Sequence, residues 1–327
     1  MRPTMLHVFG VTFPFFALVL LGYGAARRGW VPLGAIPGLN TFVLFFALPC
    51  MLFRFGVTTD MAQLLQPAIW VLHLSVSLLV VACTLVLTRR GPIGWNDASF
   101  GALVAAFPNT GFMGVPLLVG LLGVQVSAPV IITILIDLVV TSSLCIALSR
   151  LDGAGLAGAR VAAKRALRGV LSNPMPWAIL LGAWFSAAKW QLPKAVEQSV
   201  WMLADAASPT ALFTIGAVLA RAQGVAPGSV TSVAVWPVVV IKLLLHPLLV
   251  LMGGLLFIRL GWPIALETLT VLVLVAALPS ASNVSMLAER FNADTGRIAR
   301  IILLTTVLAF VTFSAAVYGL RQSPMWG

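Results

Sequence analysis

Charged residues are scarce in this sequence. Asp, Glu, Lys and Arg make up 9% of its 327 residues, and apolar residues make up 60%. Soluble globular chains carry about 25% charged residues. A chain with so few charges cannot cover its surface with groups that water solvates. The composition therefore predicts an integral membrane protein, and it excludes a soluble enzyme, a secreted disulfide scaffold and a disordered tail.

Cysteines and catalytic motifs are also scarce. Cys50, Cys83 and Cys145 each lie inside an apolar run, which is typical of small packing residues rather than of a disulfide or metal set. The sequence has no P-loop, no H-E-x-x-H pair and no nucleophile–base set. The stretch 153–158 fits G-x-G-x-x-G, but it follows an apolar helix and no strand, so it is interpreted as a flexible link. We therefore expect no enzyme, no metal site and no cofactor.

Apolar runs bounded by charge, glycine and proline predict ten membrane-spanning helices. The length of the chain allows about ten spans of roughly 20 residues each, with no room for a soluble domain. The N-terminal run has no small-residue cleavage site, so we interpret it as the first span and not as a signal peptide. The predicted spans are about 5–26, 34–54, 66–88, 95–121, 127–149, 171–188, 199–220, 230–258, 263–289 and 297–320.

The basic residues predict the orientation of these spans. The net charge is +11, and the longest polar link, 150–170, carries five basic residues. If this link is cytoplasmic, thirteen basic residues lie on the cytoplasmic side and six on the outer side, with Lys242 inside a span. This asymmetry follows the positive-inside rule and explains the charge without nucleic acid. We expect a multi-pass protein of the bacterial inner (plasma) membrane with both termini periplasmic.

Five spans on each side of the basic link indicate two halves. They are a first five-helix repeat, 1–149, and a second, 171–327, joined by a cytoplasmic linker, 150–170. An odd number of spans in each half makes the repeat inverted in the membrane. The fourth spans support it, because residues 105–109 (AAFPN) and 276–280 (AALPS) match at an offset of 171 residues.

A proline sits in the middle of both matching segments. Pro108 and Pro279 each remove a helix hydrogen bond. Unwound backbone at membrane depth is tolerated only inside protein or beside a water-filled cavity, and half-helix N-termini there favour an anion. Proline kinks also occur in ordinary spans, but their matched positions favour a binding site. Pro108, Gly111 and Pro279 are expected to break the helices. The residues expected to bind substrate are Asn109, Thr110, Ser280, Ser282 and Asn283.

The stretch 107–118 (FPNTGFMGVPLL) resembles the fourth-span motif of the auxin efflux carrier family. That family groups plant auxin carriers with bacterial transporters, some of them assigned to malonate or malate. The resemblance covers nearly the whole chain. Further stretches that fit it are 39–41 with 47–49, 208–213 with Gly216, Lys242 with Pro247, 277–283 and 288–294.

The resemblance implies an all-α integral membrane fold of ten helices in two inverted five-helix repeats, with crossed, broken fourth and ninth helices (NhaA-like and bile-acid-symporter-like). Spans 1, 2, 6 and 7 would form a scaffold, often dimeric, and spans 3–5 and 8–10 a transport domain that moves like an elevator. Substrate would bind at the crossing. The short central link is similar to that of bacterial members, and the pattern at Ser280 and Asn283 argues against auxin itself.

Two charged residues are expected inside the membrane, where a charge costs about 2.5–3.5 kcal/mol. Asp137 lies in the fifth span and Lys242 in the eighth. They are interpreted either as a buried ion pair that holds the transport domain together or as a titrating site, with Lys242 alternatively a counter-charge for an anion. His73 and His246 relay protons or are hydrogen-bonded packing residues.

The sequence thus predicts a secondary active transporter of a small organic anion, a dicarboxylate such as malonate or malate. The alternatives are an auxin-like aromatic carboxylate efflux carrier or uniporter, an anion channel, and a membrane receptor. The coupling ion, H⁺ or Na⁺, and the direction of transport stay open. The expected partners are the anion, membrane lipid and a second copy in a homodimer, with no nucleic acid.

Overall fold

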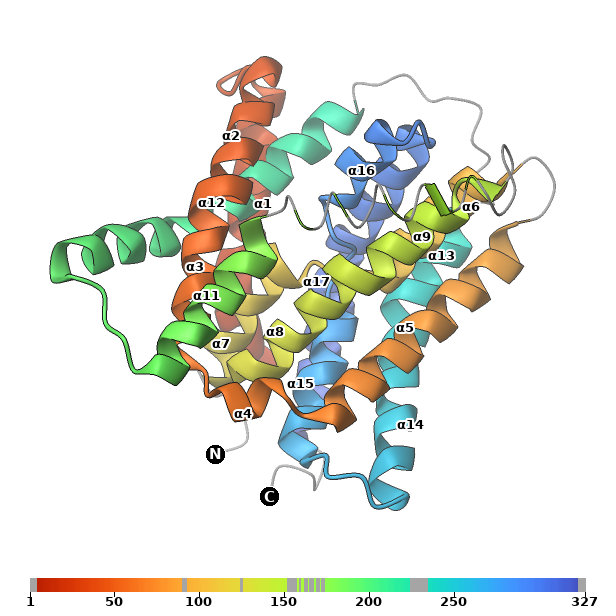
Figure 1. The fold of residues 1–327 in the computed structure, drawn as a ribbon. Coiled ribbons are helices and arrows are strands. Elements are labelled where there is room, and N and C mark those ends of the chain that lie inside the picture. The colour runs from red at the N-terminus through yellow and green to blue at the C-terminus, as the bar shows by residue number, and fades with distance from the viewer. Residues whose placement is uncertain are drawn as a thin grey trace.

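The computed structural model describes residues 5–89, 93–123, 126–151, 174–223 and 235–322, together with 158, 160, 161, 164, 168 and 171. Most of the predicted linker 150–170 lies outside these residues. Within them the chain is helical with short connections and no strand (Figure 1). Six helices are long and apolar enough to cross a membrane, and three shorter helices are also apolar. The fold is therefore all-helical and fits an integral membrane protein, while the number of crossings stays a prediction.

The helices follow one another along the chain without long structured loops. Four five-residue π-helical turns interrupt them: η2 (Val43–Ala47), η3 (Thr110–Gly114), η5 (Asp137–Thr141) and η7 (Ile241–Leu245). In the first half the α-helices are α1 (Met5–Arg27), α2 (Ile36–Phe42), α3 (Leu48–Thr58), α4 (Met61–Leu64), α5 (Pro67–Thr88), α6 (Trp95–Ala106), α7 (Val115–Leu122), α8 (Ser127–Ile136) and α9 (Ser142–Leu148). In the second half they are α11 (Pro174–Ala188), α12 (Lys194–Gln223), α13 (Trp236–Val240), α14 (His246–Arg259), α15 (Leu266–Ala277), α16 (Val284–Arg290) and α17 (Thr295–Gln322).

The largest differences between the helices and the predicted spans lie at the starts of two helices. The helix predicted over 199–220 begins at Lys194, because Pro193 opens its first turn by accepting hydrogen bonds from the backbone N–H of Val196 and Glu197. That turn is polar, so hydropathy alone does not detect it. The first residues of the predicted span 230–258 lie outside the described residues, and the described helix there begins at Trp236.

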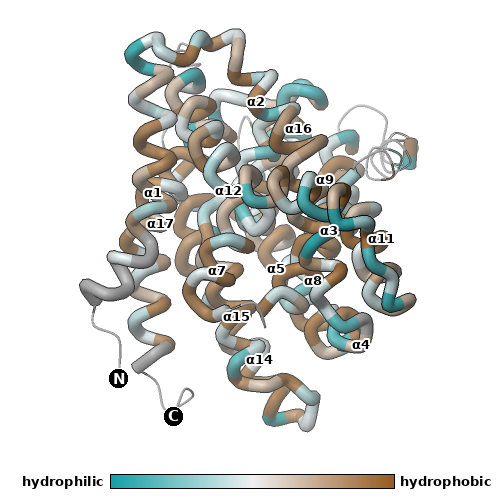
Figure 2. The backbone as a smooth tube through the Cα atoms, turned by 90° about the vertical axis from the view of Figure 1, so that its left-hand side faces the viewer, coloured by the Kyte–Doolittle hydropathy of each residue, from teal (hydrophilic) through white to brown (hydrophobic). Residues whose placement is uncertain are grey.

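Large apolar side chains lie on the outside of the molecule. Leu20 and Leu21 on α1, and Val307 and Val311 on α17, are each more than half exposed. Figure 2 shows α1 and α17, which contact each other, with long apolar stretches along one edge of the molecule. Such a surface is a liability in water but suits hydrocarbon. In both views the first residues of α1 and the last residues of α17 lie at the same end of the bundle.

The helices pack as two groups. In the first helix group, α1 packs on α12, and α3 packs on both α11 and α12. In the second helix group, α5 packs on α6 and α14, α14 packs on α15, and α15 packs on α17. The two groups touch where α1 meets α7 and α17, and where α12 meets η3 and α17.

Glycines let the helices of the first group approach closely. A Cβ atom on Gly22 of α1 would collide with the backbone carbonyl of Phe213 on α12, and one on Gly216 of α12 would collide with that of Val19. Gly56 of α3 and Gly182 of α11 face each other in the same way. Small residues at helix contacts are the usual means of tight packing in a membrane. The first helix group is therefore packed backbone to backbone.

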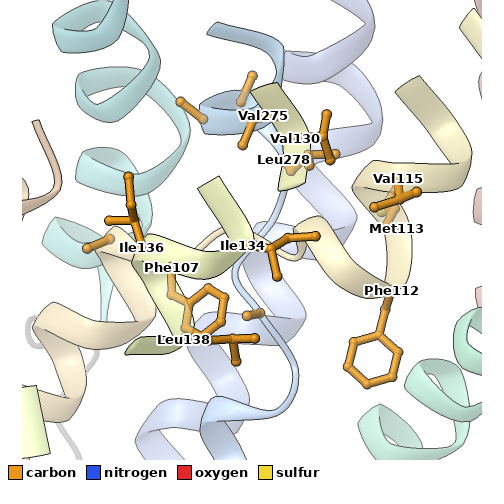
Figure 3. Close-up of a cluster of buried hydrophobic side chains, with 14 of the residues drawn as sticks. Phe107, Phe112, Met113, Val115, Val130, Ile134, Ile136, Leu138, Val275 and Leu278 are labelled. Carbon is orange, nitrogen blue, oxygen red and sulfur yellow. The ribbon is translucent and has the colours of Figure 1, made fainter. Parts of the chain in front are cut away.

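The second helix group surrounds an apolar cluster (Figure 3). Phe107 and Leu278, which directly precede the two prolines, are both buried in it, as are Val130 and Ile134 of α8. These side chains enclose the points where two helices end in mid-bundle. The two helix breaks are therefore surrounded by apolar side chains, except where the chain supplies polar groups.

The close approach of α1 to α12 generates a stability prediction. Replacing Gly22 with Ala forces a methyl group against the Phe213 carbonyl, and such overpacking costs about 1–3 kcal/mol. We expect the thermal unfolding midpoint of the detergent-purified protein to fall. Gly24→Ala, on the same helix with no atom within 4 Å of the added carbon, is the control. Equal midpoints for the two variants would contradict the close packing.

Candidate functional site

The two broken segments meet inside the second helix group. One segment runs from the end of α6 to η3, and the other runs from the end of α15 to α16. An antiparallel bridge joins Pro108 to Ser280. The backbone N–H of Asn109 donates to the Pro279 carbonyl at 2.8 Å, and the N–H of Ala281 donates to the Phe107 carbonyl at 2.9 Å. Each break thus supplies the backbone partners that the other break lacks.

Two side chains supply the remaining backbone partners at the second break. In an unbroken helix the N–H of Ser280 would donate to the carbonyl of Ala276. Instead, this N–H donates to the Thr305 hydroxyl of α17 at 3.2 Å, and the ammonium of Lys242 in η7 donates to the Ala276 carbonyl at 2.9 Å. The break in α15 is therefore held open by contacts from two other helices.

Polar side chains without partners gather at the crossing. Asn109, Thr110 and Ser280 are each at most 2% exposed. The Thr110 hydroxyl donates only a long bond, 3.4 Å, to the Pro108 carbonyl, and no protein partner is present for Asn109 Oδ1 or Ser280 Oγ. An unpaired buried polar atom lowers the stability of the fold by about 1–3 kcal/mol. A set of such atoms therefore indicates a function that packing alone does not explain. The crossing can donate and accept hydrogen bonds to a small polar ligand.

A narrow cleft lies beside the crossing, between the two helix groups. It has little more free space than one water molecule needs. From the first group it is lined by Asn40 of α2 and by one face of α12, which ends in Arg221. From the second group it is lined by Phe112, Ser282, Asn283, Ser285 and Met286.

The structure divides the predicted substrate residues between these two places. Ser282 and Asn283 line the cleft, whereas Asn109, Thr110 and Ser280 are buried at the crossing. Gly111 lies inside η3, and a Cβ atom there would meet nothing within 4 Å, so packing alone does not require this glycine.

Three polar residues of the cleft were not predicted as site residues. Asn40 lies in a stretch that fits the carrier family, and Ser285 follows the second break, so both carried a sequence signal. Arg221 is one of the thirteen basic residues that the sequence predicts on the cytoplasmic side, and it is not among the predicted substrate residues. Arg221 lies at the C-terminal end of α12, and nothing in the sequence there indicates that its side chain faces a cleft.

Four ionisable residues form a second polar cluster, buried among α5, η5, η7 and α14. His73 Nε2 lies 3.2 Å from Asp137 Oδ1, to which the Thr141 hydroxyl also donates at 3.2 Å. Lys242 Nζ lies 3.2 Å from Nδ1 of His246. All four are at most 1% exposed. Two π-helical turns, which often mark functional positions, carry Asp137 and Lys242.

The predicted ion pair between Asp137 and Lys242 is wrong as a direct contact. Within the described residues no ion pair joins them, and the partner of Asp137 is His73. The physical reason is that Lys242 is used to satisfy the Ala276 carbonyl at the helix break. A carboxylate and an imidazole in contact, each with an unpartnered second atom, can exchange a proton.

Other polar features of the described residues lie away from the crossing. No group of three His, Cys, Asp or Glu side chains there could hold a metal ion. A larger aromatic hollow, lined by residues including Phe53, Phe185 and Trp201, opens near the start of α12, at the end opposite Arg221. It lies within the first helix group alone, so it is not part of the contact between the groups.

Nearly the whole chain is similar in sequence to membrane transport proteins. The family model described as membrane transport protein matches residues 7–317. The chain is 27% identical to the "Putative malonate transporter" of Rhizobium meliloti, an alignment that covers 98% of each protein. It is 28% identical to the "Uncharacterized transporter YfdV" of Escherichia coli K12, covering 97% of this chain and 96% of that protein. It is 30% identical to "Probable auxin efflux carrier component 1c" of Oryza sativa over 36% of this chain and 20% of that protein.

The contact between Thr305 and the second break generates a testable prediction. Replacing Thr305 with Val keeps the shape but leaves the N–H of Ser280 without its acceptor, which costs about 1–3 kcal/mol. We expect a lower thermal unfolding midpoint for the purified protein. Thr306→Val is a matched control, because both hydroxyls donate to the Ile302 carbonyl and only that of Thr305 also accepts. If both variants lose the same stability, α17 does not support the break.

Proposed function

Because the chain belongs to the membrane transport protein family, which includes the auxin efflux carriers that its sequence resembles, we propose that it is a secondary transporter of a small organic anion. It is a multi-pass membrane transporter rather than an enzyme. The substrate is a dicarboxylate such as malonate or malate. The relative named as a malonate transporter, which aligns over 98% of this chain, supports this substrate class.

One observation carries the proposal. Two proline-broken helices cross inside the bundle, and the polar atoms Asn109 Oδ1 and Ser280 Oγ at the crossing have no protein partner. The Ser280 hydroxyl and the Nδ2 group of the Asn109 amide can donate hydrogen bonds to a carboxylate oxygen, and Asn109 Oδ1 can accept one from a donor of the ligand. Unwound backbone is tolerated in a membrane where it is enclosed by protein or lines a cavity, and this is the usual place for a transporter's binding site.

The cleft next to the crossing supports alternating access. A substrate of several heavy atoms does not fit the narrow cleft unless the two helix groups separate. In our proposal the first helix group is the scaffold, which forms a homodimer, and the second group is the transport domain that moves along it like an elevator. The chain crosses the membrane ten times as two inverted repeats, 1–149 and 171–327. Its membrane is the bacterial inner membrane, with both termini periplasmic.

The buried ionisable cluster supports protons rather than sodium as the coupling ion. The Ala276 carbonyl, which the helix break frees and which would suit a sodium ion, already accepts a bond from the Lys242 ammonium. The buried contact between His73 and Asp137 offers a proton-binding pair in the same helix group. Uptake measured separately with a sodium gradient and with a pH gradient distinguishes the two ions.

Replacing Asn109 with Ala tests the binding site. We expect it to abolish the accumulation of labelled malonate or malate in proteoliposomes preloaded with the same anion, because the crossing loses the amide that contacts the carboxylate. The unfolding midpoint should not fall, since the side-chain oxygen has no protein partner to lose. The readout is counterflow, with purified protein at matched density.

Ser99→Ala is the matched control for this test. Ser99 lies on α6, the helix that ends just before the crossing, and its buried hydroxyl also has no partner, but it is ten residues before Asn109. Counterflow should be normal in this control. Normal counterflow in the Asn109 variant would remove the crossing as the binding site. Wild-type vesicles that accumulate neither dicarboxylate would remove the substrate class.

A further inference from the structure

Arg221 is the basic residue that lines the cleft between the helix groups. It lies in the last turn of α12, on the first group. Ser282, Asn283 and Ser285, which follow the second break, line the cleft from the second group. No acidic residue of the described part of the chain lines it. A cleft with one cation, several hydrogen-bonding side chains and no carboxylate favours an anion.

The Arg221 guanidinium makes no hydrogen bond or ion pair within the described part of the chain. Some other arginines have such partners: Arg54 pairs with Asp205 at 2.6 Å, and Arg150 donates to the Phe291 carbonyl at 3.0 Å. Arg221 is only partly exposed. A partly buried guanidinium has five donors to satisfy, and it matches the two oxygens of a carboxylate.

Arg221 also has the ordinary features of an orienting charge. A basic residue at a helix C-terminus is stabilised by the helix dipole and follows the positive-inside rule. Both effects require only that the charge lie near the helix end. Neither requires the side chain to line a cleft opposite the hydroxyls of another helix group. The helix dipole and the positive-inside rule therefore do not explain why Arg221 lines the cleft.

We propose that Arg221 binds the second carboxylate of a dicarboxylate whose first carboxylate is bound by the polar side chains at the crossing. This inference rests on the proposed function, and it assigns the substrate class to a residue. A bidentate contact between guanidinium and carboxylate is among the stronger charge-assisted hydrogen bonds. A dicarboxylate then bridges the two helix groups, whereas a monocarboxylate leaves Arg221 without a partner. Arg221 is thus a specificity-determining residue for two carboxylates over one.

The test compares malonate with its monomethyl ester, in which one carboxylate is masked. The readouts are the apparent KM of malonate counterflow, the inhibition constant of the monomethyl ester, and the direct binding of both compounds to purified protein by calorimetry. We expect Arg221→Gln to weaken malonate binding and raise its KM roughly tenfold or more. The constants for the monomethyl ester should stay within about twofold, so the preference for two carboxylates is lost.

Two further variants separate this role from general effects of charge. Arg221→Lys keeps the charge but not the planar fork, so it should restore malonate affinity only in part. Arg290→Gln removes the same charge from an exposed residue of α16 that does not line the cleft, and it should leave both compounds unaffected. A thermal melt of each variant checks that it is folded.

The outcomes distinguish this inference from the proposed function. If wild-type protein binds and transports malonate and Arg221→Gln does so equally well, the role of Arg221 is overturned while the carrier proposal stands. Equal losses for malonate and the monomethyl ester in Arg221→Gln also overturn it, because Arg221 then does not discriminate between them. If wild-type protein neither binds nor transports malonate, the proposed dicarboxylate function fails, and the role of Arg221 fails with it.

Discussion

The backbone pairing between two broken helices is the contact on which the rest of the structure depends. Hydrocarbon offers no hydrogen bonds, so a helix that ends in mid-bundle must find partners for its N–H and C=O groups within the protein. Here the two breaks pair with each other through Asn109, Pro279, Ala281 and Phe107. The Lys242 ammonium and the Thr305 hydroxyl supply the partners that this pairing leaves over. The buried lysine is thereby explained without a direct carboxylate partner.

The same constraint separates structural polar groups from candidate functional ones. At the crossing the backbone N–H groups of Asn109, Ser280 and Ala281 have partners, whereas the side-chain atoms Asn109 Oδ1 and Ser280 Oγ do not. A protein that needed only stability would gain by replacing these side chains with apolar ones. The first helix group shows the opposite pattern, since glycines bring its backbones into contact. The second helix group thus keeps unpaired polar atoms beside the cleft, whereas the first helix group, on the other side of the cleft, is tightly packed.

The sequence predicts most of the local features of the chain, but few of the contacts between side chains that lie far apart in the sequence. Pro108 and Pro279 mark the two breaks, because proline removes a helix hydrogen bond wherever it occurs. Asp137 contacts His73 and not Lys242 because of the way their three helices are rotated about their axes. The spacing of these residues in the sequence does not determine those rotations. The sequence also does not predict that Arg221 lines the cleft, because the direction of a side chain at a helix end is decided by packing. The polar first turn at Lys194 escaped a criterion based on hydropathy.

In the proposed mechanism the two helix groups separate across the cleft, and a reversible crosslink tests this motion. Val218 of α12 and Met286 of α16 line the cleft from opposite groups. The test uses Val218→Cys with Met286→Cys in a chain whose own Cys50, Cys83 and Cys145 are replaced by Ser. We expect a disulfide between the two positions to stop counterflow and a reducing agent to restore it. Full counterflow in the crosslinked protein would show that transport does not require the two helix groups to separate.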